Sequence, residues 1–127
     1  MPALTPRQMW RLDEACRPIR QVFDALYLVG TAQNTRQYRD VDVRLMLDDD
    51  KYDSLAAVIS PGGMALLGIV FGEYLEARTG LPIDFQVQRN TEANANHPGV
   101  RNPLGLRTLA NYRGDGAPEP KGRDDVV

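Results

Sequence analysis

Residues 26–47, LYLVGTAQNTRQYRDVDVRLML, decide the fold class of this chain. The segment predicts a short apolar strand, a tight turn at Gly30 and Thr31, a polar loop and a second strand. Asp40 and Asp42 are separated by one residue in that second strand, so the alternation of strand side chains places both carboxylates on one face. Two like charges at this spacing destabilise each other unless a cation lies between them. The pair therefore indicates a site for a hard divalent metal with oxygen ligands.

The N-terminal segment predicts a helix that packs on the core. Thr5 is suited to the N-cap, Pro6 to the first helical position, and Gln8 completes a capping box. Apolar residues then recur every three or four positions and form one stripe, which consists of Met9, Leu12, Cys16, Ile19, Phe23 and Leu26. Pro18 interrupts this pattern, so we expect either a kink or two abutting helices there.

The middle of the chain predicts a second helix and a third strand. Residues 64–78 form the helix, and Gly80 supplies its left-handed C-cap. Residues 82–89 alternate as a strand with Asp84 on the polar face, and the Asn-, Gly- and Pro-rich stretch after Arg89 predicts loop. We expect a small α/β (α+β) domain with a mixed sheet of at least three strands, helices packed on one face and an acidic cluster at an exposed edge.

Length and composition predict one soluble domain. The 127 residues are 43% hydrophobic and 25% charged, and the net charge of −2 gives no general attraction for nucleic acid or acidic membranes. We expect one domain over 1–112 and a disordered tail over 113–127, where apolar residues are scarce. The single cysteine, Cys16, and the lack of a signal pattern favour a cytoplasmic protein, and the longest apolar run, 64–71, is too short to cross a bilayer.

Three motifs together resemble the nucleotidyltransferase superfamily, which has the DNA polymerase beta-like fold, and in particular its minimal nucleotidyltransferases. The turn at Gly30-Thr31 resembles the family's glycine-serine turn, and Asp40-Val41-Asp42 resembles its Asp-x-Asp strand. A later strand of that family supplies a third aspartate, a position that Ile83-Asp84-Phe85 fits. The resemblance covers roughly residues 26–89, half of the chain.

The resemblance implies a reaction as well as a fold. A nucleoside monophosphate would move from a nucleoside triphosphate to an acceptor, which is a protein, an RNA end or a small molecule, with Mg2+ or Mn2+ as cofactor. The implied catalytic and metal-binding residues are Asp40, Asp42 and Asp84, and the implied nucleotide-binding residues are Gly30, Thr31 and Arg36. Asp40 and Asp42 would fix the cations on the triphosphate, and Asp84 would serve the acceptor.

Two other classes of function stay open at this point. The chain fits a catalytically degenerate member of the family that acts as a binding or regulatory module, or a structural Asp-x-Asp strand with no ligand. All three carboxylates are present, which favours an active transferase. Thr31 in place of the usual serine, and the short loop over 32–39, favour the degenerate alternative.

Several other polar residues have two interpretations each. Arg39 either contacts phosphate or is solvated, and the acidic run 48–50 fits a solvated turn better than a cation site. His97 fits an ordinary loop histidine better than a catalytic or metal-binding one. Arg101 and Arg107 either fold back toward a polyanionic substrate or stay in solvent.

Overall fold

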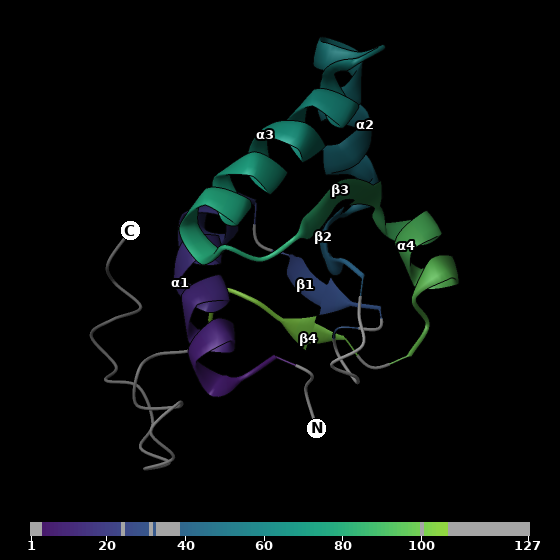
Figure 1. Cartoon of the computed structure of the whole chain (residues 1–127). Helices are drawn as coiled ribbons and strands as arrows, with labels where there is room; N and C mark the ends of the chain where they lie inside the picture. Colours follow the sequence, from purple (N-terminus) through teal and green to yellow (C-terminus); the bar gives the residue numbers. More distant parts are fainter. Residues whose placement is uncertain (1–3, 24, 31, 33–38, 100, 107–127) are drawn as a thin grey trace, which may run out of the picture.

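Four strands form one mixed sheet in the part of the chain that the computed structural model describes, residues 4–23, 25–30, 32, 39–99 and 101–106 (Figure 1). The strands are β1 (Leu26–Val29), β2 (Val41–Leu47), β3 (Ile83–Arg89) and β4 (Asn102–Pro103). Their spatial order is β3-β2-β1-β4; β1 is antiparallel to β2 and β4, whereas β2 and β3 are parallel. The helices are α1 (Pro6–Phe23), α2 (Asp49–Ile59), α3 (Gly63–Thr79) and α4 (Asn90–Asn96). The expected α+β class with a mixed sheet is confirmed.

Helix α1 begins as its sequence predicts. The Thr5 backbone N–H donates to Gln8 Oε1 at 2.8 Å, and the Gln8 backbone N–H donates to Thr5 Oγ1 at 3.1 Å, which completes the capping box. The stripe residues from Met9 to Ile19 are buried. Pro18 lies inside a single continuous helix, so the alternative of two abutting helices is wrong.

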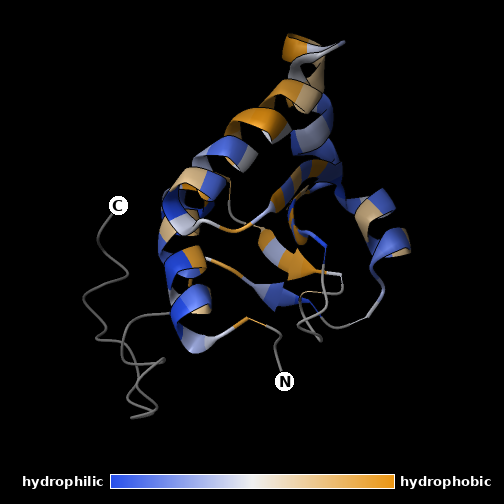
Figure 2. Cartoon of the chain, in the orientation of Figure 1, coloured by the Kyte–Doolittle hydropathy of each residue, from blue (hydrophilic) through white to orange (hydrophobic). Residues whose placement is uncertain are grey.

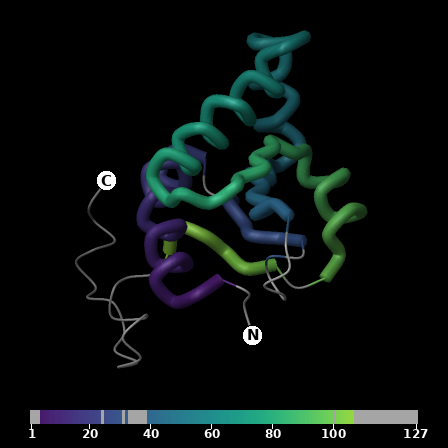
Figure 3. Tube along the Cα trace, in the orientation of Figure 1, coloured from purple at the N-terminus to yellow at the C-terminus, as the bar shows by residue number. Residues whose placement is uncertain are grey.

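The main core lies between one face of the sheet and helices α1 and α3 (Figures 1 and 3). Leu28, Val43 and Phe85 are register partners on three neighbouring strands, and all three side chains are buried on this face. Gly68 lets α3 approach β3 closely, because a Cβ at that position would lie 2.8 Å from the Phe85 carbonyl oxygen. Helix α3 ends at Gly80, whose φ of 73° is the expected left-handed C-cap.

Helix α4 occupies a stretch that the sequence predicted to be loop, so that prediction is wrong. The helix packs on the opposite face of the sheet, where Ala93 is buried against Val29 and Met46 (Figure 3). Its first turn is fixed from outside, because the Thr91 backbone N–H donates to Asp49 at 3.0 Å. Tertiary contacts therefore stabilise a helix for which the local Asn-rich sequence has low propensity.

The acidic run at residues 48–50 starts a helix rather than forming the expected solvated turn. Asp48 is the N-cap of α2, and its Oδ1 accepts a hydrogen bond of 2.9 Å from the Lys51 backbone N–H. Asp49 and Asp50 lie in the first turn, where the helix dipole favours negative charge. Asp49 also forms an ion pair of 3.3 Å with Arg89, which joins α2 to the end of β3.

Hydrophobic residues occur along helices α2 and α3 (Figure 2). Several of their large apolar side chains are exposed, namely Val58, Leu66, Ile69 and Val70. By itself, no helix in the described part of the chain has the length and apolarity to cross a membrane. The pair α2 and α3 passes the same test together, by length and composition only, across a bend of 102°. The predicted tail over 113–127 lies outside the described residues.

Asp13 joins α1 to the segment that follows β4, and its replacement tests this packing. Its side chain is fully buried, and Oδ1 accepts a hydrogen bond of 2.8 Å from the Gly105 backbone N–H. We expect Asp13→Ala to lower the free energy of unfolding by about 1–3 kcal/mol, because a buried donor loses its acceptor. Thermal melting should show a loss of about 5–10 °C.

Two controls accompany this measurement. Asp13→Asn keeps an oxygen acceptor and should lose less, and Glu14→Ala, at an exposed position of the same helix, should leave the melting temperature nearly unchanged. Equal losses for Asp13→Ala and Glu14→Ala would show that the Asp13 hydrogen bond does not stabilise the fold.

Candidate acidic site

Asp42 and Asp84 are direct register partners in the parallel pair β2 and β3. Because they are register partners on neighbouring strands, their Cα atoms lie one strand spacing apart, ~4.8 Å, and their side chains share the face of the sheet opposite the main core. The Asp42 side chain is 26% exposed and that of Asp84 is 40% exposed. The two strands are therefore adjacent, and the two carboxylates lie side by side.

Asp40 lies just before β2, which begins at Val41, and it is exposed. The alternation expected for Asp40 and Asp42 within one strand therefore does not apply, although Asp40 is near enough to act on the pKa of Asp42. Among the described residues, no three side chains of His, Cys, Asp or Glu gather into a ready-made metal site. The structure brings Asp42 and Asp84 together and leaves the third predicted carboxylate, Asp40, exposed just before β2.

Gly30 contacts Asp42 directly. Its φ is +77°, a conformation that glycine adopts without strain, and a Cβ there would lie 2.2 Å from Asp42 Oδ2. The sequence interpretation assigned Gly30 to close approach of a phosphate. The structure gives a further reason for glycine, because a side chain at this turn would occupy the place of the Asp42 carboxylate.

Arg44 is the residue that the sequence interpretation left without a role. It follows Asp42 by two positions on the same face, and its side chain is only 8% exposed. The Nη2 atom lies 3.3 Å from Asp84 Oδ2 and 3.8 Å from Asp42 Oδ1. The alternation along β2 places Arg44 beside the carboxylates, and this was the available signal, since a cation is expected near such a pair.

The charges of the site compete at Asp42. Burial is the largest effect and raises the pKa of the Asp42 carboxyl above its ordinary value. The Arg44 guanidinium opposes this change and lowers the pKa, whereas Asp84 and then Asp40 raise it. The net direction is upward, so the ionised form of Asp42 is less favourable in the folded protein than in water.

His97 and Arg101 lie beside this acidic site. His97 is the C-cap of α4; burial, then Arg44 and Arg101, lower the pKa of its imidazole and so favour the neutral form. Arg101 donates from Nε to the His97 carbonyl oxygen at 3.1 Å, and its guanidinium lies 5.6 Å from the centre of the Tyr27 ring. His97 is near enough to Asp42 and Arg44 for their charges to act on its pKa.

Several predicted residues have no described position. Thr31 and Arg36, two of the three predicted nucleotide-binding residues, and Arg107 lie outside the described residues. Arg39 is described and exposed, in a bend before β2. The part of the predicted nucleotide site that the structure describes is therefore Gly30.

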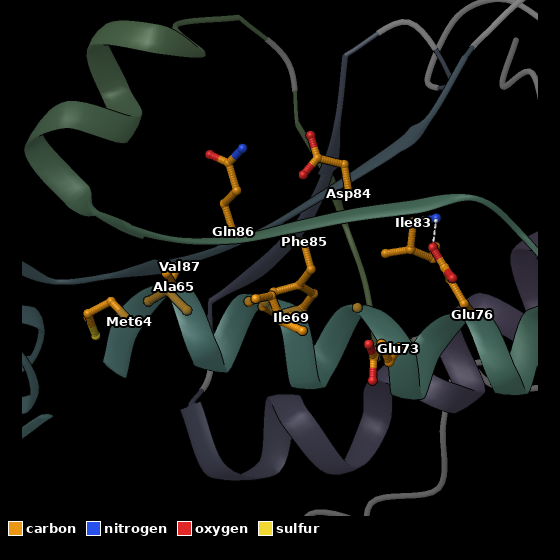
Figure 4. Close-up of a pocket in the computed structure, with 12 residues that line it drawn as sticks. Met64, Ala65, Ile69, Glu73, Glu76, Ile83, Asp84, Phe85, Gln86 and Val87 are labelled. Atoms are coloured by element: carbon orange, nitrogen blue, oxygen red, sulfur yellow. Dashed lines mark hydrogen bonds between the residues drawn. The ribbon is translucent and has the colours of Figure 1, made fainter. Parts of the chain in front are cut away.

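A groove of about 560 Å³ runs between α3 and β3 (Figure 4). Phe85 points toward α3, whereas Asp84 and Gln86 point to the other side of the strand. Asp84 thus lies at the rim of this groove as well as beside Asp42. A molecule that approaches along the outer strand meets Asp84 before Asp42, because β3 is at the edge of the sheet.

The acidic site thus consists of Asp42, Asp84, Arg44 and the turn at Gly30, with Asp40 and His97 around them. No protein-family model matches the chain, and neither a curated protein nor a solved structure gives a significant match to it.

Proposed function

We propose that this protein is a metal-dependent nucleotidyltransferase, which moves a nucleoside monophosphate from a nucleoside triphosphate to an acceptor. The observation that carries the proposal is the register pairing of Asp42 with Asp84 on the partly exposed face of two parallel strands. The Gly30 turn, in contact with Asp42, supplies backbone beside these carboxylates. Carboxylates next to a glycine turn suit a phosphate ester whose charge is balanced by a cation.

The donor set fits Mg2+ or Mn2+ in chemistry. Asp42 and Asp84 stand on neighbouring strands, and Asp40 lies exposed just before β2. Hard divalent cations prefer oxygen ligands of this kind. Burial and the neighbouring carboxylates raise the pKa of Asp42, a cost that a bound cation relieves. Asp42 and Asp84, with Asp40 nearby, would hold such a cation, which would supply the positive charge that phosphate oxygens and a leaving pyrophosphate require.

The protein's own groups divide the remaining work. Asp42 is the more buried carboxylate and lies against the Gly30 turn, so it serves the nucleotide. Asp84 is more exposed and lies on the edge strand, so it orients the attacking acceptor group and accepts its proton. Arg44 holds its guanidinium between them and favours negative charge on the transferred group.

A binding or regulatory module is the second candidate, and one observation favours it. Arg44 already neutralises part of the charge on Asp42 and Asp84, so a metal ion is not the only cation available to the pair. A protein of this kind would bind a nucleotide without transferring any part of it. Transfer to an acceptor, whether a protein, an RNA end or a small molecule, therefore distinguishes the transferase from the binding module.

Metal binding gives the first test of the proposal. Mn2+ should raise the melting temperature of the wild-type protein, because it binds the folded acidic site. Asp42→Asn should abolish that increase and leave the metal-free protein equally or slightly more stable. The pKa of Asp42 is raised by folding, so its ionised form disfavours the fold above that pKa, and a neutral amide removes this cost.

Calorimetric titration with Mn2+, alone and with each nucleoside triphosphate, completes the measurement. Asp50→Asn, which changes an exposed aspartate of α2, is the matched control and should show the same Mn2+-induced increase in melting temperature as wild type. The same Mn2+-induced shift in wild type and Asp42→Asn would contradict the assignment of the metal to Asp42.

A further inference from the structure

Arg44 stands where a cation would compensate the carboxylates of Asp42 and Asp84. Its side chain comes from the middle of β2, two residues beyond Asp42, and is almost completely buried. A buried guanidinium is costly without partners, and the nearest negative charges are those two carboxylates. The charge of the pair is therefore already balanced in part by the chain itself.

The contacts of Arg44 differ in quality. The short one joins Nη1 to the Asp84 backbone carbonyl oxygen at 2.7 Å, and a second joins Nη1 to the Val43 carbonyl oxygen at 3.1 Å. The contacts with the carboxylates are longer, 3.3 Å to Asp84 and 3.8 Å to Asp42, whereas a fork of two charge-assisted bonds has distances of about 2.7–2.9 Å. Backbone oxygens thus anchor the guanidinium, and the carboxylates hold it loosely.

The Nε atom supports the same conclusion. It is buried and has no hydrogen-bond partner within the described part of the chain. A guanidinium whose main role was to seal an ion pair would use its donors fully. Arg44 instead leaves a donor unused and keeps both carboxylates within reach of another cation.

From these contacts we infer that Arg44 is a built-in counter-cation, which competes with a divalent metal ion for Asp42 and Asp84 and remains anchored beside them when the metal binds. The inference rests on the proposed function for the identity of the competing ion. Because backbone bonds hold Nη1, Nη2 would be free to contact a phosphate oxygen if the carboxylates bound a metal instead. Arg44 would thereby weaken metal binding in the absence of a nucleotide.

Mn2+ alone is the probe for this inference, with calorimetry and melting temperature as readouts. Arg44→Gln removes the charge and keeps a polar side chain, and we expect it to bind Mn2+ at least about tenfold more tightly than wild type. Arg44→Lys keeps a cation and should bind Mn2+ as wild type does. Arg101→Gln is the matched control, because Arg101 bonds to His97 and Asn94, and its Mn2+ affinity should also be unchanged.

The outcomes separate this inference from the proposed function. Equal Mn2+ affinities for wild type and Arg44→Gln would overturn the competition and leave the metal site in place. Absence of Mn2+ binding in every variant, Arg44→Gln included, would overturn both. If Arg44→Gln does not fold, the double variant Arg44→Gln/Asp84→Asn decides: folding restored by removal of one carboxylate supports the counter-cation, and continued unfolding overturns it.

Discussion

Asp84→Asn should lower nucleotidyl transfer by about 10²–10⁴-fold while leaving nucleotide affinity within about tenfold of wild type. The reason is the position of Asp84. It lies on the edge strand, with 40% of its side chain exposed, while Asp42 lies deeper against the Gly30 turn. A group that acts on the attacking hydroxyl contributes chiefly in the transition state, so its loss reduces turnover more than binding.

The fold should tolerate this substitution well. The bond of 2.7 Å from Arg44 to position 84 goes to the backbone carbonyl oxygen, which asparagine retains. A melting temperature close to that of wild type would therefore exclude unfolding as the cause of lost activity. Glu73→Gln is the matched control, because it also converts a carboxylate to an amide on the wall of the same groove, and its turnover should be unchanged.

Single-turnover transfer from nucleotides labelled at the α-phosphate, measured beside equilibrium binding, provides the readout. RNA 3′ ends, proteins with free hydroxyl groups and small alcohols serve as the acceptors. Unchanged transfer in Asp84→Asn would remove Asp84 from the reaction. Tight nucleotide binding by wild type without transfer to any acceptor would favour the regulatory module.

The sheet and its polar face follow from residue patterns along β2 and β3. Each strand alternates apolar and polar residues, so burying one face on α1 and α3 leaves Asp42, Arg44 and Asp84 together on the other. The crossover through two helices also suits a parallel pair, because parallel neighbours need a long connection. Alternation therefore predicts on which face of the sheet these side chains lie. The long connection between β2 and β3 is consistent with their parallel pairing.

Other features depend on contacts that no local pattern contains. Helix α4 follows an Asn-rich stretch, and its stability comes from Ala93 against the sheet and from Thr91 bonded to Asp49, forty-two residues earlier. The position of Asp40 outside β2 depends on where pairing with β3 begins. The role of Arg44 likewise requires the Asp84 carbonyl oxygen, which only the folded sheet brings within reach.

Substitution of Gly30 can separate an effect on Mn2+ binding from an effect on fold stability, because Gly80 is a matched glycine away from the acidic site. Both have positive φ, +77° at Gly30 and +73° at Gly80, and alanine at either position should cost about 1–2 kcal/mol of backbone strain. No atom lies within 4 Å of a Cβ built at Gly80, whereas at Gly30 the Cβ would meet the Asp42 carboxylate at 2.2 Å. Alanine at Gly30 therefore forces the Asp42 side chain out of its place.

We accordingly expect two separate results from this pair. Gly80→Ala should lower the melting temperature by several degrees and leave Mn2+ affinity unchanged. Gly30→Ala should lower the melting temperature by a similar or somewhat larger amount and should abolish the Mn2+-induced increase, because Asp42 can no longer face Asp84. Melting curves of both variants with and without Mn2+ measure this difference. Mn2+ binding by Gly30→Ala at the wild-type level would show that the metal does not depend on the contact between Gly30 and Asp42.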